Sequence, residues 1–163
     1  MAYNPQGDRL AIGSHDNRIL IYNSKDKYKR VAILKAHNSF ITSLDWSLRG
    51  DYLRSNCGAY ELLFFTVDTV SKQDPSGASN TVGTAWQTQT CKLGWNVQGI
   101  FPVGCDGTHI NGVDMSTDET LIATGDDYGL LNIYRNPVLE GHEARMFRGH
   151  SEHVTRVRFT EKN

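Results

Sequence analysis

The sequence predicts an all-β protein built from repeated units of strands, and three observations support this prediction. Short runs rich in Ile, Leu, Val, Phe and Tyr alternate with turns rich in Gly, Asp and Asn. No segment shows helical periodicity with caps. Two different patterns also recur along the chain in step with each other. A repeat of roughly 40 to 50 residues indicates a solenoid or a propeller, and four strands per unit favour a β-propeller over a sandwich.

The first recurring pattern is a strand, a turn of small or polar residues and a second strand that ends on an aromatic residue. It is seen in RLAIGSHDNRILIY from Arg9 to Tyr22 and in LIATGDDYGLLNIY, which ends at Tyr134. Between them DYLRSNCGAYELLFF, from Asp51 to Phe65, follows the same plan. The chain therefore contains three copies of this pattern.

The second pattern places apolar residues four, seven and nine positions after a histidine. AHNSFITSLDW contains His37, and GHSEHVTRVRF contains His150. The same spacing counted back from the apolar residues at 110, 113 and 115 puts Asp106 in the histidine position. The third copy has therefore lost its histidine, and an insertion of about 25 residues separates Phe65 from Asp106. The insertion begins as a loop, SKQDPSGASN, and we expect an outer strand at Ala85–Leu93 because that stretch is rich in β-forming residues.

These spacings divide the chain into blades. We expect a partial blade of three strands in 1–35, a blade with the long insert in 36–93, a blade in 94–148 and the first strand of a further blade in 149–163. Propellers have roughly four to eight blades, so about three and a half cannot close a ring. The predicted fold is thus a fragment of a propeller.

Composition excludes several classes of protein. The 163 residues carry 17 Lys and Arg against 18 Asp and Glu, so no large net charge favours nucleic acid or an anionic membrane. No apolar run is long enough to span a bilayer, and no export signal is visible. Cys57, Cys91 and Cys105 fit no disulfide or zinc spacing. These features favour a reducing, cytosolic setting.

The residues resemble the WD-repeat superfamily through Gly149-His150 and through SHDNRILIY from Ser14 to Tyr22. The segments SNCGAYELLFF, WQTQTCKLGWNVQGIFPVGCDGTHIN and TGDDYGLLNIY are more specifically similar to the echinoderm microtubule-associated protein-like family. This resemblance accounts for both the insertion and the missing histidine, and it implies the second propeller of the family's tandem atypical propeller domain. Ala59 departs from the pattern, since an Asp is expected in that turn.

The resemblance implies a non-catalytic scaffold that binds tubulin and microtubules, with other cytoskeletal or axonemal proteins as further partners. It implies a location in the cytoplasm, on the microtubule cytoskeleton, including the ciliary axoneme or the spindle. The alternative is a general WD-repeat adaptor that recruits proteins in signalling or ubiquitin transfer, because one fold hosts many functions. A hydrolase or isomerase would need a polar cluster around a pocket. No phosphate loop, nucleophile elbow or zinc-protease motif occurs in the sequence, so we expect no catalytic residue, no cofactor and no metal.

The polar residues of the repeat are expected to be structural. We interpret the two histidines as hydrogen-bond partners of turn aspartates, and the aspartates as side chains that fix their own turns. His150 and His153 lack a completing carboxylate or Cys in the sequence, which argues against zinc. The structural set is Asp16, His37, Asp106, Asp126, Asp127 and His150.

One basic stretch is the candidate binding site. KDKYKR places Lys25, Lys27, Lys29 and Arg30 on a loop and an outer strand, where they could meet an acidic partner such as tubulin. The alternative interpretation is a solvated outer strand whose lysines prevent edge pairing. Trp46, Trp86 and Trp95 are expected to pack in the core or between blades rather than to contact a partner.

Overall fold

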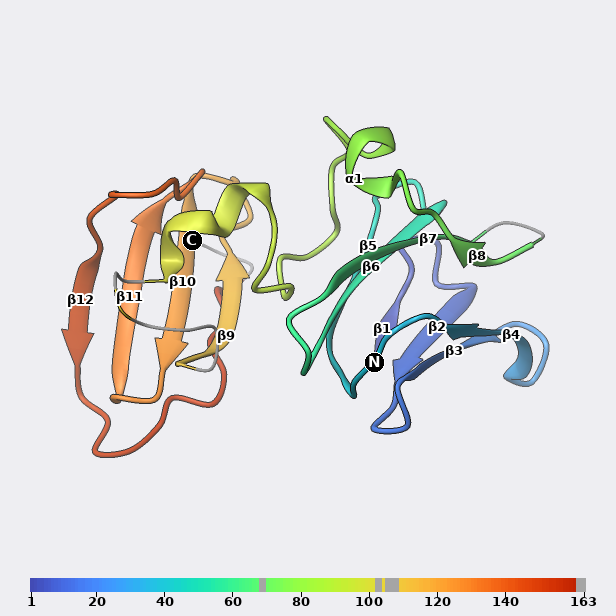
Figure 1. Cartoon of the computed structure of the whole chain (residues 1–163), viewed down its shortest axis with the longest axis horizontal. Helices are drawn as coiled ribbons and strands as arrows, with labels where there is room; N and C mark the ends of the chain where they lie inside the picture. The colour runs from blue at the N-terminus through green and yellow to red at the C-terminus, as the bar shows by residue number, and fades with distance from the viewer. Residues whose placement is uncertain (68–69, 102–103, 105–108, 161–163) are drawn as a thin grey trace. The chain divides into compact units, whose positions relative to one another are not determined.

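The computed structural model describes residues 1–67, 70–101, 104 and 109–160, and its strands form three antiparallel four-stranded sheets (Figure 1). The chain divides into two compact units, Met1–Cys91 with two sheets and Lys92–Asn163 with the third. In these described ranges the helical segments are α1 (Gly77–Asn80) and a 3-10 helix, Trp95–Ile100. No helix in the described residues is long and apolar enough to cross a membrane. The prediction of an all-β, partial propeller is confirmed, since three sheets are fewer than the roughly four blades of the smallest propellers.

The first sheet has the strand order β1-β2-β3-β4. Its strands are β1 (Ala2–Tyr3), β2 (Arg9–Gly13), β3 (Arg18–Asn23) and β4 (Lys29–Lys35). Only three strands were expected here. The additional one, β1, pairs Ala2 with Ala11, and two residues are too few to show an alternating pattern in the sequence.

The second sheet has the order β5-β6-β7-β8. Its strands are β5 (Ile41–Trp46), β6 (Tyr52–Cys57), β7 (Leu62–Thr66) and β8 (Lys72–Gln73). The outer strand expected at Ala85–Leu93 is wrong, because β8 occupies the edge of the sheet and 85–93 contains only one isolated bridge, from Trp86 to Ser47. The β-forming residues of that stretch are used in side-chain contacts that are described below.

The third sheet has the order β12-β11-β10-β9, and Figure 1 shows its strands side by side. They are β9 (Ile110–Met115), β10 (Leu121–Asp126), β11 (Leu130–Arg135) and β12 (Arg145–Arg148). The described part of the segment expected to begin a further blade, 149–160, forms no strand. Val154 and Val157 are nevertheless buried against Ala123, so this segment packs through its side chains.

Alternating apolar residues build the core of each unit. In β3, for example, Ile19 and Ile21 are fully buried while Arg18 faces solvent, as expected for a strand with a period of two. They belong to one cluster with Trp46, Leu53 and other residues of both sheets of the first unit. The second unit has its own cluster, which includes residues of the 3-10 helix. Each unit thus carries a separate hydrophobic core.

The three repeated turns have one backbone feature in common. The residue at the matching position of each turn has positive φ: Asn17 at 65°, Tyr60 at 58° and Gly129 at 74°. Asn and Gly adopt this conformation readily, whereas a Tyr does so at some energetic cost. The turn of the second sheet therefore needs stabilising contacts from elsewhere, and these come from the site described next.

Candidate functional site

The basic stretch lies at the tip of the β3–β4 hairpin. Lys25 and Lys27 are in the turn, and Lys29 and Arg30 begin β4, which is the edge strand of the first sheet. All four side chains are exposed. The turn is closed by a hydrogen bond from the Lys29 amide to the Asp26 carbonyl oxygen, 2.8 Å, and Lys27 adopts positive φ. The hairpin therefore presents its cations at its outer end.

These four cations form no ion pair with any residue in the described parts of the chain, although Arg18 near the other end of the hairpin contacts Asp16 at 3.5 Å. Basic residues also lie on the edge strands of the other sheets, with Lys72 in β8 and Arg145 and Arg148 in β12. The outermost strand of every sheet thus carries positive charge that is available to an acidic partner.

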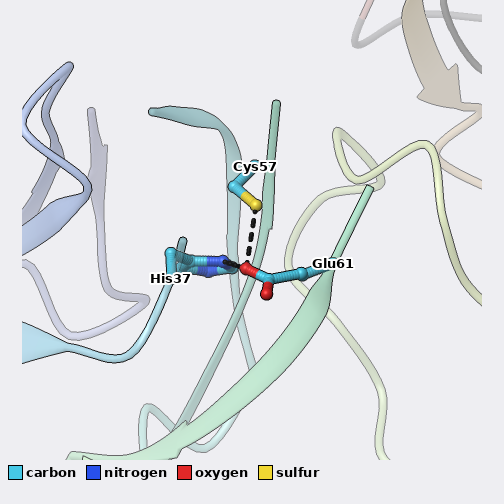
Figure 2. Close-up of side chains that lie close together, drawn as sticks. All are labelled: His37, Cys57 and Glu61. Carbon is cyan, nitrogen blue, oxygen red and sulfur yellow. Dashed lines mark hydrogen bonds and ion pairs between the residues drawn. The ribbon is translucent and has the colours of Figure 1, made fainter. Parts of the chain in front are cut away.

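A second polar site lies at the turn of the second sheet, where Glu61 accepts hydrogen bonds from His37, Cys57 and Asn38. Figure 2 shows the first two of these contacts. His37 Nδ1 lies 3.2 Å from Glu61 Oε2, the Cys57 thiol donates to the same oxygen over 3.1 Å, and the Asn38 amide donates over 3.0 Å. The Asn38 side-chain amide also donates to Oε1 of Glu61. His37 was expected to bond to a turn aspartate. With Ala59 in that position, Glu61 two residues later is the partner.

Burial and these contacts set the protonation states of the site. The Asn38 backbone amide, followed by the Cys57 thiol and the Asn38 side chain, lowers the pKa of Glu61 from 4.5 to about 2. Burial lowers the pKa of His37 despite its contact with Glu61. Burial also raises the pKa of Cys57. At neutral pH the site therefore contains a carboxylate, a neutral imidazole and a thiol.

The turn of the third sheet is stabilised differently. Asp126 Oδ1 accepts the backbone amides of Tyr128 and Leu130, both over 2.9 Å, and Oδ2 accepts the Asn132 side-chain amide over 3.2 Å. Asp126 is buried. The neighbouring Asp127 lies 3.2 Å from His153 Nδ1.

The remaining turn residues of the sequence analysis are placed as follows. His150 is exposed on the segment after β12, so the histidine that contacts a turn aspartate is the one three residues later. Asp16 is exposed in the turn of the first sheet and contacts Arg18. Asp106 and Cys105 lie outside the described residues.

The inserted segment binds to a buried aspartate that the sequence analysis did not single out. Asp45 in β5 is fully buried and forms an ion pair with Arg54 of β6, 3.1 Å. Its carboxylate accepts hydrogen bonds from the backbone amides of Thr90 and Cys91, over 2.8 and 3.0 Å. Thr88 and Thr90 donate their hydroxyls to it as well. The β-forming residues at 85–93 therefore bind one carboxylate instead of forming a strand.

The tryptophans fall into three environments. Trp46 is buried and donates its indole N–H to the Ala2 carbonyl oxygen, 3.0 Å. Trp86 lies under the Arg54 guanidinium, 4.3 Å from its ring centre. Trp95 is 70% exposed, so it does not pack in the core, and packing between blades stays a prediction. The buried apolar residues of its 3-10 helix are Val97 and Ile100.

Comparison with protein families identifies one match over the whole chain. The sequence model of the echinoderm microtubule-associated protein second β-propeller matches residues 1–163. This agrees with the resemblance noted in the irregular middle of the sequence.

Individual relatives carry related names. The chain is 62% identical over 161 residues to the ciliary WD repeat-containing protein ctxp80 of Euplotoides octocarinatus, covering 99% of this chain and 22% of that protein. It is 44% identical to human echinoderm microtubule-associated protein-like 1, covering 98% of this chain and 20% of the relative. It is 42% identical to the 77 kDa echinoderm microtubule-associated protein of Lytechinus variegatus, covering 98% of this chain and 24% of the relative. The chain thus spans about a fifth to a quarter of the length of these relatives.

A solved structure supports the fold. The β-propeller domain of Cps50 (Swd1) from Myceliophteria thermophila matches 98% of this chain and 58% of that chain, with a TM-score of 0.58 and 17% identity. At this identity the likeness concerns the propeller fold alone.

Proposed function

The chain belongs to the echinoderm microtubule-associated protein family and matches its second β-propeller, and from this we propose that it is part of a non-catalytic scaffold that binds tubulin or microtubules. Relatives at 42–44% identity are named as microtubule-associated proteins, and one at 62% is named as ciliary. The proposed location is accordingly the microtubule cytoskeleton, including the axoneme of cilia.

The observation that carries the proposal is the exposed basic end of the β3–β4 hairpin. Lys25, Lys27, Lys29 and Arg30 are all solvent-exposed and lie in one short stretch of a tight turn and an edge strand. A rigid hairpin that presents several cations complements an acidic protein surface, and such contacts chiefly raise the association rate and make binding sensitive to salt. This arrangement suits a partner that is contacted at many points.

Microtubule co-sedimentation of the complete protein tests this proposal. Reversal of the four charges to Glu is expected to weaken binding about tenfold at low salt, since several exposed contacts of modest strength are lost together. The matched control is reversal of Arg145 and Arg148 in β12, which are exposed on the edge strand of another sheet. Unchanged binding by the hairpin variant would remove the hairpin as the binding site.

The same assay separates the scaffold from an adaptor of another kind. If the complete unaltered protein does not co-sediment with microtubules or bind soluble tubulin at any salt concentration, the tubulin-binding proposal fails. If both charge-reversal variants weaken binding equally, the contact with microtubules involves the edge strands of both sheets and not the hairpin alone.

A further inference from the structure

Three side chains of different ligand chemistry meet at the turn of the second sheet. These are the imidazole of His37, the thiol of Cys57 and the carboxylate of Glu61, and their ligand atoms all lie within 4.8 Å of one another. Figure 2 shows the Glu61 carboxylate between the His37 ring and the Cys57 sulfur. We propose that these residues form a binding site for a zinc ion.

The three ligands come from three parts of the fold that the core holds together. His37 is in the connection before β5, Cys57 ends β6 and Glu61 immediately precedes β7. β6 is paired on one side with β5 and on the other with β7. The positions of the ligands are therefore set by the folded sheet rather than by one flexible loop.

Two of the three distances between ligand atoms are close to those of a zinc site. Nδ1 of His37 and Sγ of Cys57 lie 3.2 and 3.1 Å from Glu61 Oε2, and all three ligand atoms lie within 4.8 Å of one another. Zinc bonds of about 2.0–2.3 Å in a tetrahedral arrangement place such ligand atoms roughly 3.3–3.7 Å apart. To bind the ion, the imidazole and the thiol must therefore approach each other by up to about 1 Å, while the Glu61 carboxylate moves slightly away from both.

Charge and proton accounting also fit a divalent ion. Without metal, the thiol proton and an imidazole proton point at one carboxylate oxygen. Zinc binding releases the thiol proton and leaves a thiolate and a carboxylate, whose two negative charges balance Zn²⁺. The imidazole stays neutral and carries its proton on Nε2 instead of Nδ1. One proton is thus released for each ion bound.

Neighbouring groups are placed to support the ligands. Nε2 of His37 lies 2.6 Å from Ser55 Oγ, which can accept a hydrogen bond from the Nε2–H group of the metal-bound tautomer. The Asn38 amides hold the Glu61 carboxylate in position. Ligating histidines in zinc sites commonly use the second ring nitrogen in this way, and such contacts fix the ring orientation.

The ligand set selects the class of metal. A nitrogen, a thiolate sulfur and one carboxylate oxygen suit zinc, whereas Mg²⁺ and Ca²⁺ require sites made of oxygen atoms. Three protein ligands would leave the fourth tetrahedral position to a water molecule.

Calorimetric titration of the reduced, tag-free chain with Zn²⁺ tests the site, with Co²⁺ as a spectroscopic probe of thiolate coordination. We expect one zinc per chain and a thiolate-to-cobalt absorption band in the near ultraviolet. Cys57→Ser and Glu61→Gln should weaken zinc binding by more than about a hundredfold, and Ser55→Ala by about tenfold. Cys91→Ser is the matched control, because it removes the other buried thiol and leaves the three ligands intact.

A second measurement needs no variant. Bound zinc should slow alkylation of Cys57 in the unaltered folded chain and leave the rate at Cys91 unchanged, as followed by peptide mass spectrometry. The proposal is overturned if the folded chain binds no zinc, if the cobalt band survives Cys57→Ser, or if zinc leaves the alkylation rate of Cys57 unchanged.

Discussion

The turns of the second and third sheets both have positive φ at the matching residue, Tyr60 or Gly129, but carboxylates stabilise them over very different sequence distances. In the third sheet, Asp126 accepts hydrogen bonds from residues two to six positions away. In the second sheet, the matching residue is Cys57, and Glu61 accepts hydrogen bonds from His37 and Asn38, 24 and 23 positions away. The Asp126 side chain thus bonds within its own hairpin, while Glu61 also bonds to the loop that leads into its sheet. The backbone of the third-sheet turn still has distant contacts, since the Asp126 carbonyl oxygen accepts the Val154 amide over 2.9 Å.

The first strands of the same two sheets each carry an aspartate in an ion pair, and the two ion pairs differ in burial. Asp45 in β5 and Asp114 in β9 each accept a backbone amide of a later segment, from Cys91 in the first case and Phe159 in the second. Asp45 is fully buried with the buried Arg54, whereas Asp114 pairs with Arg158, whose side chain is 45% exposed. Equivalent positions of the repeat therefore make similar contacts that differ in burial. Burial decides how much the loss of each aspartate lowers the free energy of unfolding.

The largest effect is expected from removing the buried carboxylate. Asp45→Ala should lower the free energy of unfolding by about 3–5 kcal/mol, because it leaves the Arg54 charge buried without its ion-pair partner. Asp114→Ala is the matched variant, with an expected loss of about 1 kcal/mol since Arg158 can return to solvent. Urea denaturation measures both. Equal losses would contradict the assignment of burial as the cause.

A smaller effect is expected where two glycines receive an apolar side chain. A Cβ at Gly13 would lie 2.5 Å from Ile41 Cγ2, and one at Gly125 would lie 2.4 Å from Val154 Cγ1. Gly13→Ala and Gly125→Ala should each cost about 1–3 kcal/mol through overpacking. Gly149→Ala is the control because nothing lies within 4 Å of its added Cβ. If Gly125→Ala is as harmless as the control, residues 149–160 do not pack as the structure has them.

The next effect is a pH dependence of stability that is caused by Glu61 in the turn of the second sheet. The pKa of Glu61 falls from 4.5 to about 2 on folding, so the unfolded chain binds the proton more tightly. Stability from this group is therefore complete above about pH 4.5 and is lost as the pH falls towards 2. The exposed part of the side chain limits the loss to roughly 1–2 kcal/mol. Thermal unfolding from pH 7 to 3 should show a shallower decline for Glu61→Gln than for the unaltered chain.

The smallest effect is expected from Asp126, whose side chain bonds only within the hairpin of the third sheet among the described residues. Asp126→Ala should cost about 0.5–1.5 kcal/mol, since neighbouring backbone groups lose their acceptor. The rate of hydrogen exchange should increase at the backbone amides of Tyr128 and Leu130, which donate hydrogen bonds to Asp126 in the unaltered chain. A loss of protection throughout β9 and β10 would mean that this turn, like that of the second sheet, supports distant structure.

Prediction from the sequence succeeded where a contact is local or repeated. The copies ending at Tyr22, Phe65 and Tyr134 coincide with the ends of β3, β7 and β11 to within one residue, because a strand, a tight turn and a strand are specified by neighbouring residues. The segment 85–93 was assigned wrongly because β propensity describes a preference for a pleated, half-buried surface. Four contacts to Asp45 offset that preference.

The sequence by itself thus determined the all-β class, the repeat and the exposed basic stretch at Lys25–Arg30, since these follow from periodicity and from the hydration of charge. Only the tertiary structure showed which carboxylates form hydrogen bonds with residues far away in the sequence. Glu61 reaches His37, and Asp45 binds the inserted segment, because strand pairing brings residues that are far apart in the chain into hydrogen-bonding range. Residues paired over such long distances have no characteristic spacing that a single sequence could reveal. The short-range contacts of Asp126 do have one, because an Asp in a turn commonly bonds to the backbone a few residues later.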